Sequence, residues 1–187
     1  MTARAWVLPV LFWAAVPVRG ARDASEYDIV IYGATSAGII AGIKARALGR
    51  TAAVVDPGRH IGGLSSGGLG ATDIGNKDAI GGLARSFYAR VAAAYGKTGT
   101  QWTFEPHVAL GIFEALVKES GLPLFLDEKL DRSGGVVKDK NRIIRIQTKA
   151  GRVFKGKMFV DATYEGDLMA AAGVSYTVGR EGNGLYG

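Results

Sequence analysis

The chain has 187 residues, of which 48% are hydrophobic and 21% are charged, and its formal net charge is +6. This length and composition are typical of a folded domain and exclude an intrinsically disordered chain. The absence of cysteine excludes disulfides, zinc–thiolate sites, iron–sulfur ligation and a thiol nucleophile, and the two histidines, His60 and His107, are too few for a histidine-rich metal site. We therefore expect no metal site.

Residues 1–20 have the composition of a secretory signal peptide. A positively charged start precedes an apolar run of 14 residues over 5–18, and small residues follow it. A membrane-spanning helix needs about 20 apolar residues, so this run is short, and Pro9 and Pro17 would disturb a helix. We expect an export signal over 1–20, a periplasmic or extracellular mature domain over 21–187 and no stable membrane span; an uncleaved anchor is the alternative.

A strand, a glycine-containing turn, a helix and a second strand follow in order. Residues 27–32 are rich in β-branched residues and predict a buried strand, which leads directly into the turn 33–38. The pattern then predicts a helix over 39–48 and a buried strand over 51–55, which ends at Asp56. This order is the βαβ fingerprint of dinucleotide-binding proteins.

Each position of the fingerprint has a physical role. Gly33 permits the tight turn after the strand, and Gly38 permits close packing of the helix on the sheet. Free N–H groups at the helix start can hold a diphosphate. Asp56 lies 23 residues after Gly33, close to the expected ~20, and can accept hydrogen bonds from a ribose. Thr35 replaces the middle glycine of the motif, so a turn without a ligand is the alternative.

The next elements extend the predicted sheet. A glycine-rich loop over 58–70 is long enough to indicate a function, because such loops let the main chain approach a ligand. Periodic apolar residues predict helices over 79–95 and from Pro106 to Gly121, and an apolar run predicts a strand over 122–126. A small antiparallel meander is expected from three short segments, followed by a separate core strand: 136–137, 142–148 and 152–154, then 157–161.

A cluster of polar residues follows the last predicted strand. Asp161, Tyr164, Glu165 and Asp167 lie within seven residues, and paired carboxylates can perform acid–base chemistry. Acids in this position also bind cofactor hydroxyls or cap a following helix, here 168–172. We consider these two roles better supported than acid–base chemistry. The sequence therefore assigns no catalytic residue.

Residues 129–157 contain a local excess of positive charge. They hold ten Lys or Arg against Asp131 and Asp139. Such a segment could bind nucleic acid or an acidic polysaccharide. The basic residues alternate with isoleucines, as on the solvent side of strands, and Phe154 is the only aromatic residue within 129–157 that could stack on bases. We expect a solvated face and no nucleic-acid partner.

These motifs together resemble the FAD-dependent oxidoreductases of the glutathione-reductase-like superfamily, and in particular exported bacterial members that have been labelled xanthan lyase. The resemblance covers nearly all of 27–187 and is carried by four segments: Gly33-Ala34-Thr35-Ser36-Ala37-Gly38 with Asp56, Gly62-Gly63-Leu64, Gly67-Gly68-Leu69-Gly70-Ala71-Thr72-Asp73-Ile74-Gly75, and Val160-Asp161-Ala162-Thr163-Tyr164-Glu165-Gly166-Asp167-Leu168. It implies an α/β Rossmann-like domain with a central parallel sheet, flanking helices and a β-meander. It also implies that the 187 residues are the N-terminal part of a longer chain.

The resemblance further implies which residues bind FAD. The diphosphate would lie on 33–38, the adenosine ribose on Asp56, the adenine near the main chain of Leu130, and the flavin end near the glycine loop and 161–167. The residues expected to contact FAD are Gly33, Thr35, Ser36, Ala37, Gly38, Asp56, Pro57, Arg59, Gly62, Gly63, Leu64, Leu130, Asp161, Ala162, Thr163, Gly166 and Asp167.

The expected function is that of an FAD-dependent oxidoreductase, with hydride transfer from an organic substrate, a small molecule or a carbohydrate-like compound, to the flavin. An NAD-dependent dehydrogenase domain is one alternative, although the glycine loop and the meander do not favour it. The other alternative is a non-catalytic secreted module that binds acidic polysaccharide through 129–157. The sequence contains no constellation of residues that could cleave a sugar, so it does not support lyase activity.

Overall fold

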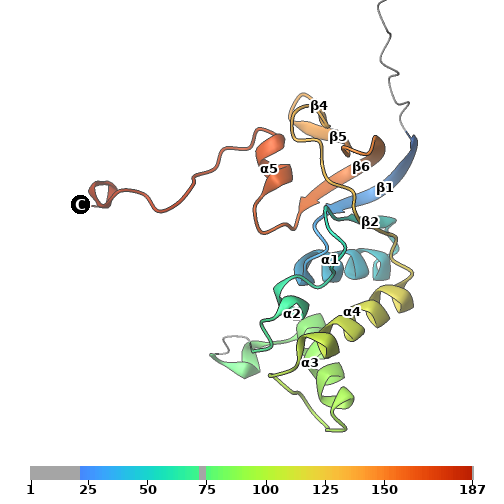
Figure 1. Cartoon of the computed structure of the whole chain (residues 1–187), viewed down its shortest axis with the longest axis vertical. Helices are drawn as coiled ribbons and strands as arrows, with labels where there is room; N and C mark the ends of the chain where they lie inside the picture. Colours follow the sequence, from blue (N-terminus) through green and yellow to red (C-terminus); the bar gives the residue numbers. More distant parts are fainter. Residues whose placement is uncertain (1–21, 72–74, 187) are drawn as a thin grey trace, which may run out of the picture.

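The computed structural model describes residues 22–71 and 75–186 and shows a six-stranded sheet with helices packed against it (Figure 1). The expected export signal over 1–20, and residues 72–74 of the glycine motif, lie outside the described residues. The strands are β1 (Arg22–Tyr32), β2 (Ala52–Val55), β3 (Leu124–Phe125), β4 (Val136–Asp139), β5 (Arg142–Gln147) and β6 (Arg152–Asp161). The helices are α1 (Ser36–Ala47), α2 (Leu64–Gly67), α3 (Gly82–Ala94), α4 (Pro106–Ser120) and α5 (Asp167–Ala171), with 3₁₀ turns at Lys77–Ala79 and Asn183–Leu185.

The strand order is β3-β2-β1-β6-β5-β4. From β1 the chain proceeds outward through β2 to the edge strand β3, then crosses to the opposite edge strand β4 and returns inward through β5 to β6, beside β1. The pairs β3–β2, β2–β1 and β1–β6 are parallel, whereas β6–β5 and β5–β4 are antiparallel. The predicted α/β fold, with a parallel sheet and an antiparallel meander, is therefore confirmed. Tyr32 is level with Val55 on one side and Asp161 on the other, so the segments that follow β1, β2 and β6 meet at one edge of the sheet.

Strand β6 differs from the prediction. The sequence predicted two strands, over 152–154 and 157–161, but the structure has one ten-residue strand that belongs to both the meander and the parallel sheet. Gly156 lies at the junction, and a Cβ atom there would come within 3.0 Å of Val30. Exposed Lys155 and Lys157 interrupt the apolar pattern on either side of this glycine, which is why the sequence predicted a break.

The helices largely follow the sequence signals. α4 begins with Pro106 in its first turn and ends at Gly121 in the left-handed conformation, as predicted. The short helix α2 inside the glycine loop was not predicted, because four residues carry no helical periodicity. Within 22–71 and 75–186, no helix combines the length and the apolar character needed to span a membrane.

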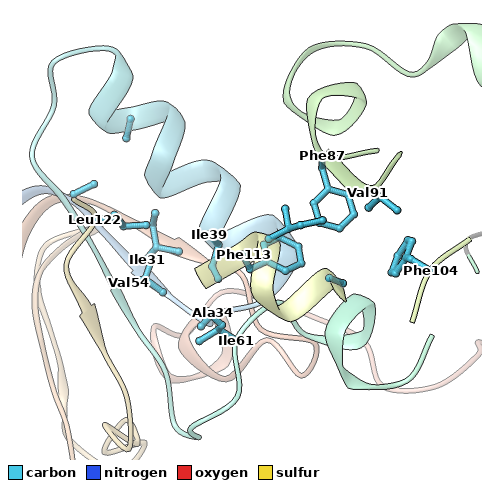
Figure 2. Packing of buried hydrophobic residues seen from close by; sticks show 14 residues of the cluster. Ile31, Ala34, Ile39, Val54, Ile61, Phe87, Val91, Phe104, Phe113 and Leu122 are labelled. Atoms are coloured by element: carbon cyan, nitrogen blue, oxygen red, sulfur yellow. The ribbon is translucent and has the colours of Figure 1, made fainter. Parts of the chain in front are cut away.

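Two apolar clusters stabilise the two faces of the sheet. On one face, Ile31 and Val54 pack against Ile39 of α1 and Phe113 of α4, and the cluster continues through aromatic side chains toward α3 (Figure 2). On the other face, Tyr32, Leu130, Ile146 and Phe154 join the parallel strands to the meander; each is fully buried. Burial of one such large side chain contributes about 1.5–3 kcal/mol to the free energy of unfolding. Both clusters therefore hold the edge of the sheet in a defined shape.

Candidate functional site

The turn after β1 is packed too closely for side chains at its two glycines. Gly33 has φ 113°, its N–H donates to Val55 O over 2.8 Å, and a Cβ atom on it would lie 2.7 Å from the carbonyl carbon of Ala162. A Cβ atom on Gly38 would lie 2.0 Å from Gly33 O. These approaches bring the start of α1 directly over the ends of β1 and β6, as the fingerprint predicts.

Thr35, which replaces the middle glycine, caps α1. Its Oγ1 accepts a hydrogen bond from Gly38 N at 3.3 Å and donates its own proton to Ala162 O at 2.8 Å. The hydroxyl proton is thus already used within the protein. The next two N–H groups, of Ser36 and Ala37, have no acceptor among the described residues, and α1 carries no acidic residue in its first turn. They are therefore available to an anion at the positive end of the helix.

Asp56 faces the same turn from the end of β2. Its Oδ2 accepts from Ala34 N at 2.5 Å and its Oδ1 accepts from Gly58 N at 2.8 Å. These two bonds fix the orientation of the carboxylate. A carboxylate has about four acceptor positions, so both oxygens can still accept a bond from a ribose hydroxyl.

The glycine loop runs beside the turn. Gly62 N donates to Ala34 O at 2.8 Å, and Thr35 and Gly62 form a parallel bridge. Leu64 N donates to the hydroxyl of Tyr164 at 2.7 Å, which connects this loop to the segment after β6. The loop therefore forms a wall of the site.

The segment after β6 is held by Asp161. Its Oδ1 accepts from Thr163 N at 3.0 Å and from Thr163 Oγ1 at 2.7 Å, and its Oδ2 accepts from Met169 N at 2.8 Å. Asp161 thus anchors the loop and the first turn of α5, which is one of the two roles that the sequence favoured for the acids of this segment; the other, binding of cofactor hydroxyls, stays a prediction.

These segments enclose one cavity of about 280 Å³ at the ends of β1, β2 and β6. Seven of the residues expected to contact FAD line it: Gly33, Thr35, Asp56, Pro57, Gly63, Thr163 and Asp167. Ala34, His60, Tyr164 and Glu165 also line it and were not among the predicted contacts. The sequence could have indicated these four residues, because each lies between predicted FAD contacts in the chain. His60 is in addition held by Ser66, whose Oγ lies 2.9 Å from Nε2.

The other expected contacts do not line this cavity. Ser36 and Ala37 lie at the adjoining start of α1, and Gly38, Gly62, Leu64, Asp161, Ala162 and Gly166 lie in the segments that support the walls. Arg59 is exposed and pairs with Asp127 at 2.5 Å. Leu130 is fully buried, and its N–H donates to the hydroxyl of Tyr32 at 2.9 Å. The contacts of these residues with FAD stay predictions.

The cavity is acidic, because the carboxylates of Asp56, Glu165 and Asp167 line it. Burial raises the pKa of the Tyr32 hydroxyl, and the nearby carboxylates of Asp167, Asp56 and Asp161 raise it further, against the lowering effect of the Leu130 hydrogen bond. Arg132 lies 3.2 Å from Asp167 and offsets part of this charge. An acidic cavity suits uncharged hydroxyls, whereas the free N–H groups at α1 suit phosphates. No cluster of three potential metal ligands occurs within 22–71 and 75–186.

This donor set fits a dinucleotide. It provides unpaired main-chain N–H groups at a helix start, a turn whose glycines exclude side chains, and an oriented carboxylate at the end of the neighbouring strand. In open α/β sheets, ligands bind at this point, where the strand order reverses.

A comparison with protein families matches residues 28–187 to the model described as "FAD dependent oxidoreductase". The chain belongs to this family. FAD is accordingly its cofactor, as predicted. No curated protein sequence matches the chain.

Solved structures show the same fold at low sequence identity. The L-proline dehydrogenase from P. horikoshii is 16% identical with a TM-score of 0.61, over 83% of this chain and 58% of that one. The flavin-dependent brominase Bmp2 is 17% identical with a TM-score of 0.55, over 80% and 41%. The flavin-containing monooxygenase from Stenotrophomonas maltophilia is 16% identical with a TM-score of 0.51, over 74% and 38%. The chain thus spans less than two thirds of the length of each of these structures.

Proposed function

We propose that the described residues bind the adenosine diphosphate half of FAD. The diphosphate lies against the N–H groups of Ser36 and Ala37, and the adenosine ribose bonds to Asp56 in the acidic cavity. The observation that carries this proposal is the meeting of unpaired helix N–H groups and an oriented carboxylate at the reversal point of the sheet. Thr35 acts on this site indirectly, because its hydroxyl fixes the start of α1 against Ala162.

We further propose that the protein oxidises a small organic molecule. Bound FAD supplies a two-electron acceptor, so a hydride leaves a substrate carbon and a proton leaves the same molecule to solvent or to a base. The chain's own residues bind and orient FAD in this scheme, and none is assigned as catalytic. The family match favours FAD over the alternative of an NAD-dependent dehydrogenase.

The basic segment 129–157 offers less free charge than its sequence suggests. Arg132, Arg152 and Lys157 pair with Asp167, Glu128 and Asp28, respectively. This pairing supports a solvated, partly neutralised face, so we do not propose polysaccharide binding as the function.

A titration of the purified chain with FAD, followed by equilibrium dialysis, tests the proposed site. We expect Asp56→Asn to weaken FAD binding by roughly tenfold or more, because hydrogen bonds to charged groups contribute about 1.5–3 kcal/mol. Asp139→Asn, which changes an exposed carboxylate of β4, is the matched control and should bind FAD like the wild type. Equal affinities in all three proteins would contradict the assignment of Asp56.

We also propose export of the protein, which is supported by the apolar run over 5–18 and its positively charged start. Amino-terminal sequencing of the mature protein tests this proposal. A mature start close to residue 21 is expected, and an intact start at Met1 in the exported fraction would contradict cleavage.

A further inference from the structure

A second cavity lies on the other side of the start of α1. It measures about 280 Å³ and is formed by α1, α2, α3 and α4. Ser36 and Ala37 line it, directly after the residues of the turn that line the acidic cavity. The two cavities therefore flank the helix start at which we place the diphosphate, and the second adjoins the glycine loop through Ser65 of α2.

The lining of the second cavity is uncharged. Its floor is aromatic, since the rings of Phe87 and Phe113 stack with centroids 4.9 Å apart and 25° between their planes (Figure 2). Leu83 and Ala84 of α3 form an apolar side wall. In contrast, the acidic cavity contains Asp56, Glu165 and Asp167. With the N–H groups of Ser36 and Ala37 occupied by the diphosphate, a further charged group would lose its hydration in the second cavity without gaining a partner, which disfavours a substrate phosphate or carboxylate there.

Three residues with a hydroxyl group line this cavity, Ser36 and Ser65 near the start of α1 and Tyr88 of α3. The hydroxyls of Ser36 and Ser65 line it, and neither has a hydrogen-bond partner among the described residues. One apolar body and a few convergent polar groups are the usual features of a site for a small organic molecule. Ser65 belongs to the glycine loop, near which the flavin end is expected, so a reacting oxygen-bearing carbon would lie at this end of the cavity.

We propose that this second cavity binds the substrate, and that the substrate is an uncharged, largely apolar organic molecule with a hydroxyl or carbonyl oxygen. Its apolar part lies on Phe87 and Phe113, and its oxygen bonds to Ser36 or Ser65. The inference rests on the proposed function, because it places the substrate beside an FAD bound across the start of α1. It excludes charged sugars and organic acids as substrates of this site.

The test uses N-phenyl-1-naphthylamine, an uncharged aromatic probe whose fluorescence rises in apolar surroundings, with the wild-type chain in the presence and absence of saturating FAD. Ala84→Trp fills the cavity from its exposed rim, and Leu83→Lys places a charge in the same wall. Ala93→Trp, on an exposed position of α3 outside the cavity, is the matched control. We expect saturable probe binding to the wild type and the control, and about tenfold weaker binding to both cavity variants. FAD should leave probe binding in place.

Two results would overturn the inference. Unchanged probe binding in Ala84→Trp and Leu83→Lys, with circular dichroism showing folded protein, would place the probe elsewhere. Displacement of the probe by FAD but not by ADP would assign the cavity to the flavin ring instead of the substrate. Failure of FAD to bind in a parallel dialysis would contradict the proposed function itself, and the cavity variants would still decide whether the second cavity binds an apolar ligand.

Discussion

Two aspartates lie at the ends of the strands on either side of β1, and the structure uses them differently. Asp56, after β2, accepts two main-chain bonds from the turn and the following loop, and it faces the cavity. Asp161, after β6, accepts three bonds within its own loop and does not line the cavity. Both follow a core strand in the sequence. The difference shows that the carboxylate of Asp56 is available to a ligand, whereas the carboxylate of Asp161 holds a loop in shape.

Between these two aspartates lies the start of α1, where the largest effect is expected. Gly38→Ala would place a Cβ atom 2.0 Å from Gly33 O and 3.0 Å from the Cβ of Ala162. Alanine favours helices over glycine, but the clash should dominate and lower the free energy of unfolding by about 1–3 kcal/mol. Chemical denaturation measures this change.

The matched control is Gly111→Ala in α4, where a Cβ atom meets nothing within 4 Å. It should raise the free energy of unfolding by about 0.5–1 kcal/mol. If Gly38→Ala also stabilised the protein, the turn after β1 and the segment after β6 would not be joined through the close contact that the structure shows.

Replacement of Asp161 would sharpen the difference between the two aspartates. Asp161→Ala leaves the N–H groups of Thr163 and Met169 without their acceptor, and we expect a loss of about 1–3 kcal/mol in the free energy of unfolding. FAD affinity, measured by dialysis well below the unfolding midpoint, should fall less than in Asp56→Asn. A folded Asp161→Ala protein that loses FAD as completely as the Asp56 variant would make both aspartates ligands.

The smallest effect is expected at Asp28, which lies within β1 beside Lys157 of β6. The hydrogen bond from Lys157 of β6, followed by the bonds from Thr51, holds the pKa of Asp28 well below its ordinary value. Because the folded-state pKa is lowered, the stabilisation is complete above the ordinary aspartate pKa of about 3.9 and is lost as the pH falls toward the folded-state pKa. The wild type should thus exceed Asp28→Asn in stability at pH 7, and the difference should narrow below about pH 4. A difference in the free energy of unfolding between the two proteins that stays constant down to pH 2 would contradict this coupling.

Much of the β1–α1–β2 wall could be predicted because its signals are local. Gly33, Gly38 and Asp56 lie within 24 residues, and each position has a steric or hydrogen-bonding requirement that few residue types meet. The helix over 106–120 was predictable for the same reason, since Pro106 and Gly121 mark its ends. The role of Thr35 was not predictable, because its acceptor, Ala162, lies 127 residues away in the chain.

By itself, the sequence determined the αβ order and the dinucleotide turn, because these depend on residue type and spacing over short distances. FAD as the cofactor was predicted from the resemblance of these motifs to a family. Only the tertiary structure decided that β6 continues through Gly156 and lies beside β1, since this pairing joins segments more than 120 residues apart. That pairing brings Tyr164, Glu165 and Asp167 to the turn after β1 and creates the acidic cavity. The packing of α3 and α4 against α1 likewise creates the uncharged cavity. Cavities form between elements, so their chemistry follows from long-range packing that no single segment encodes.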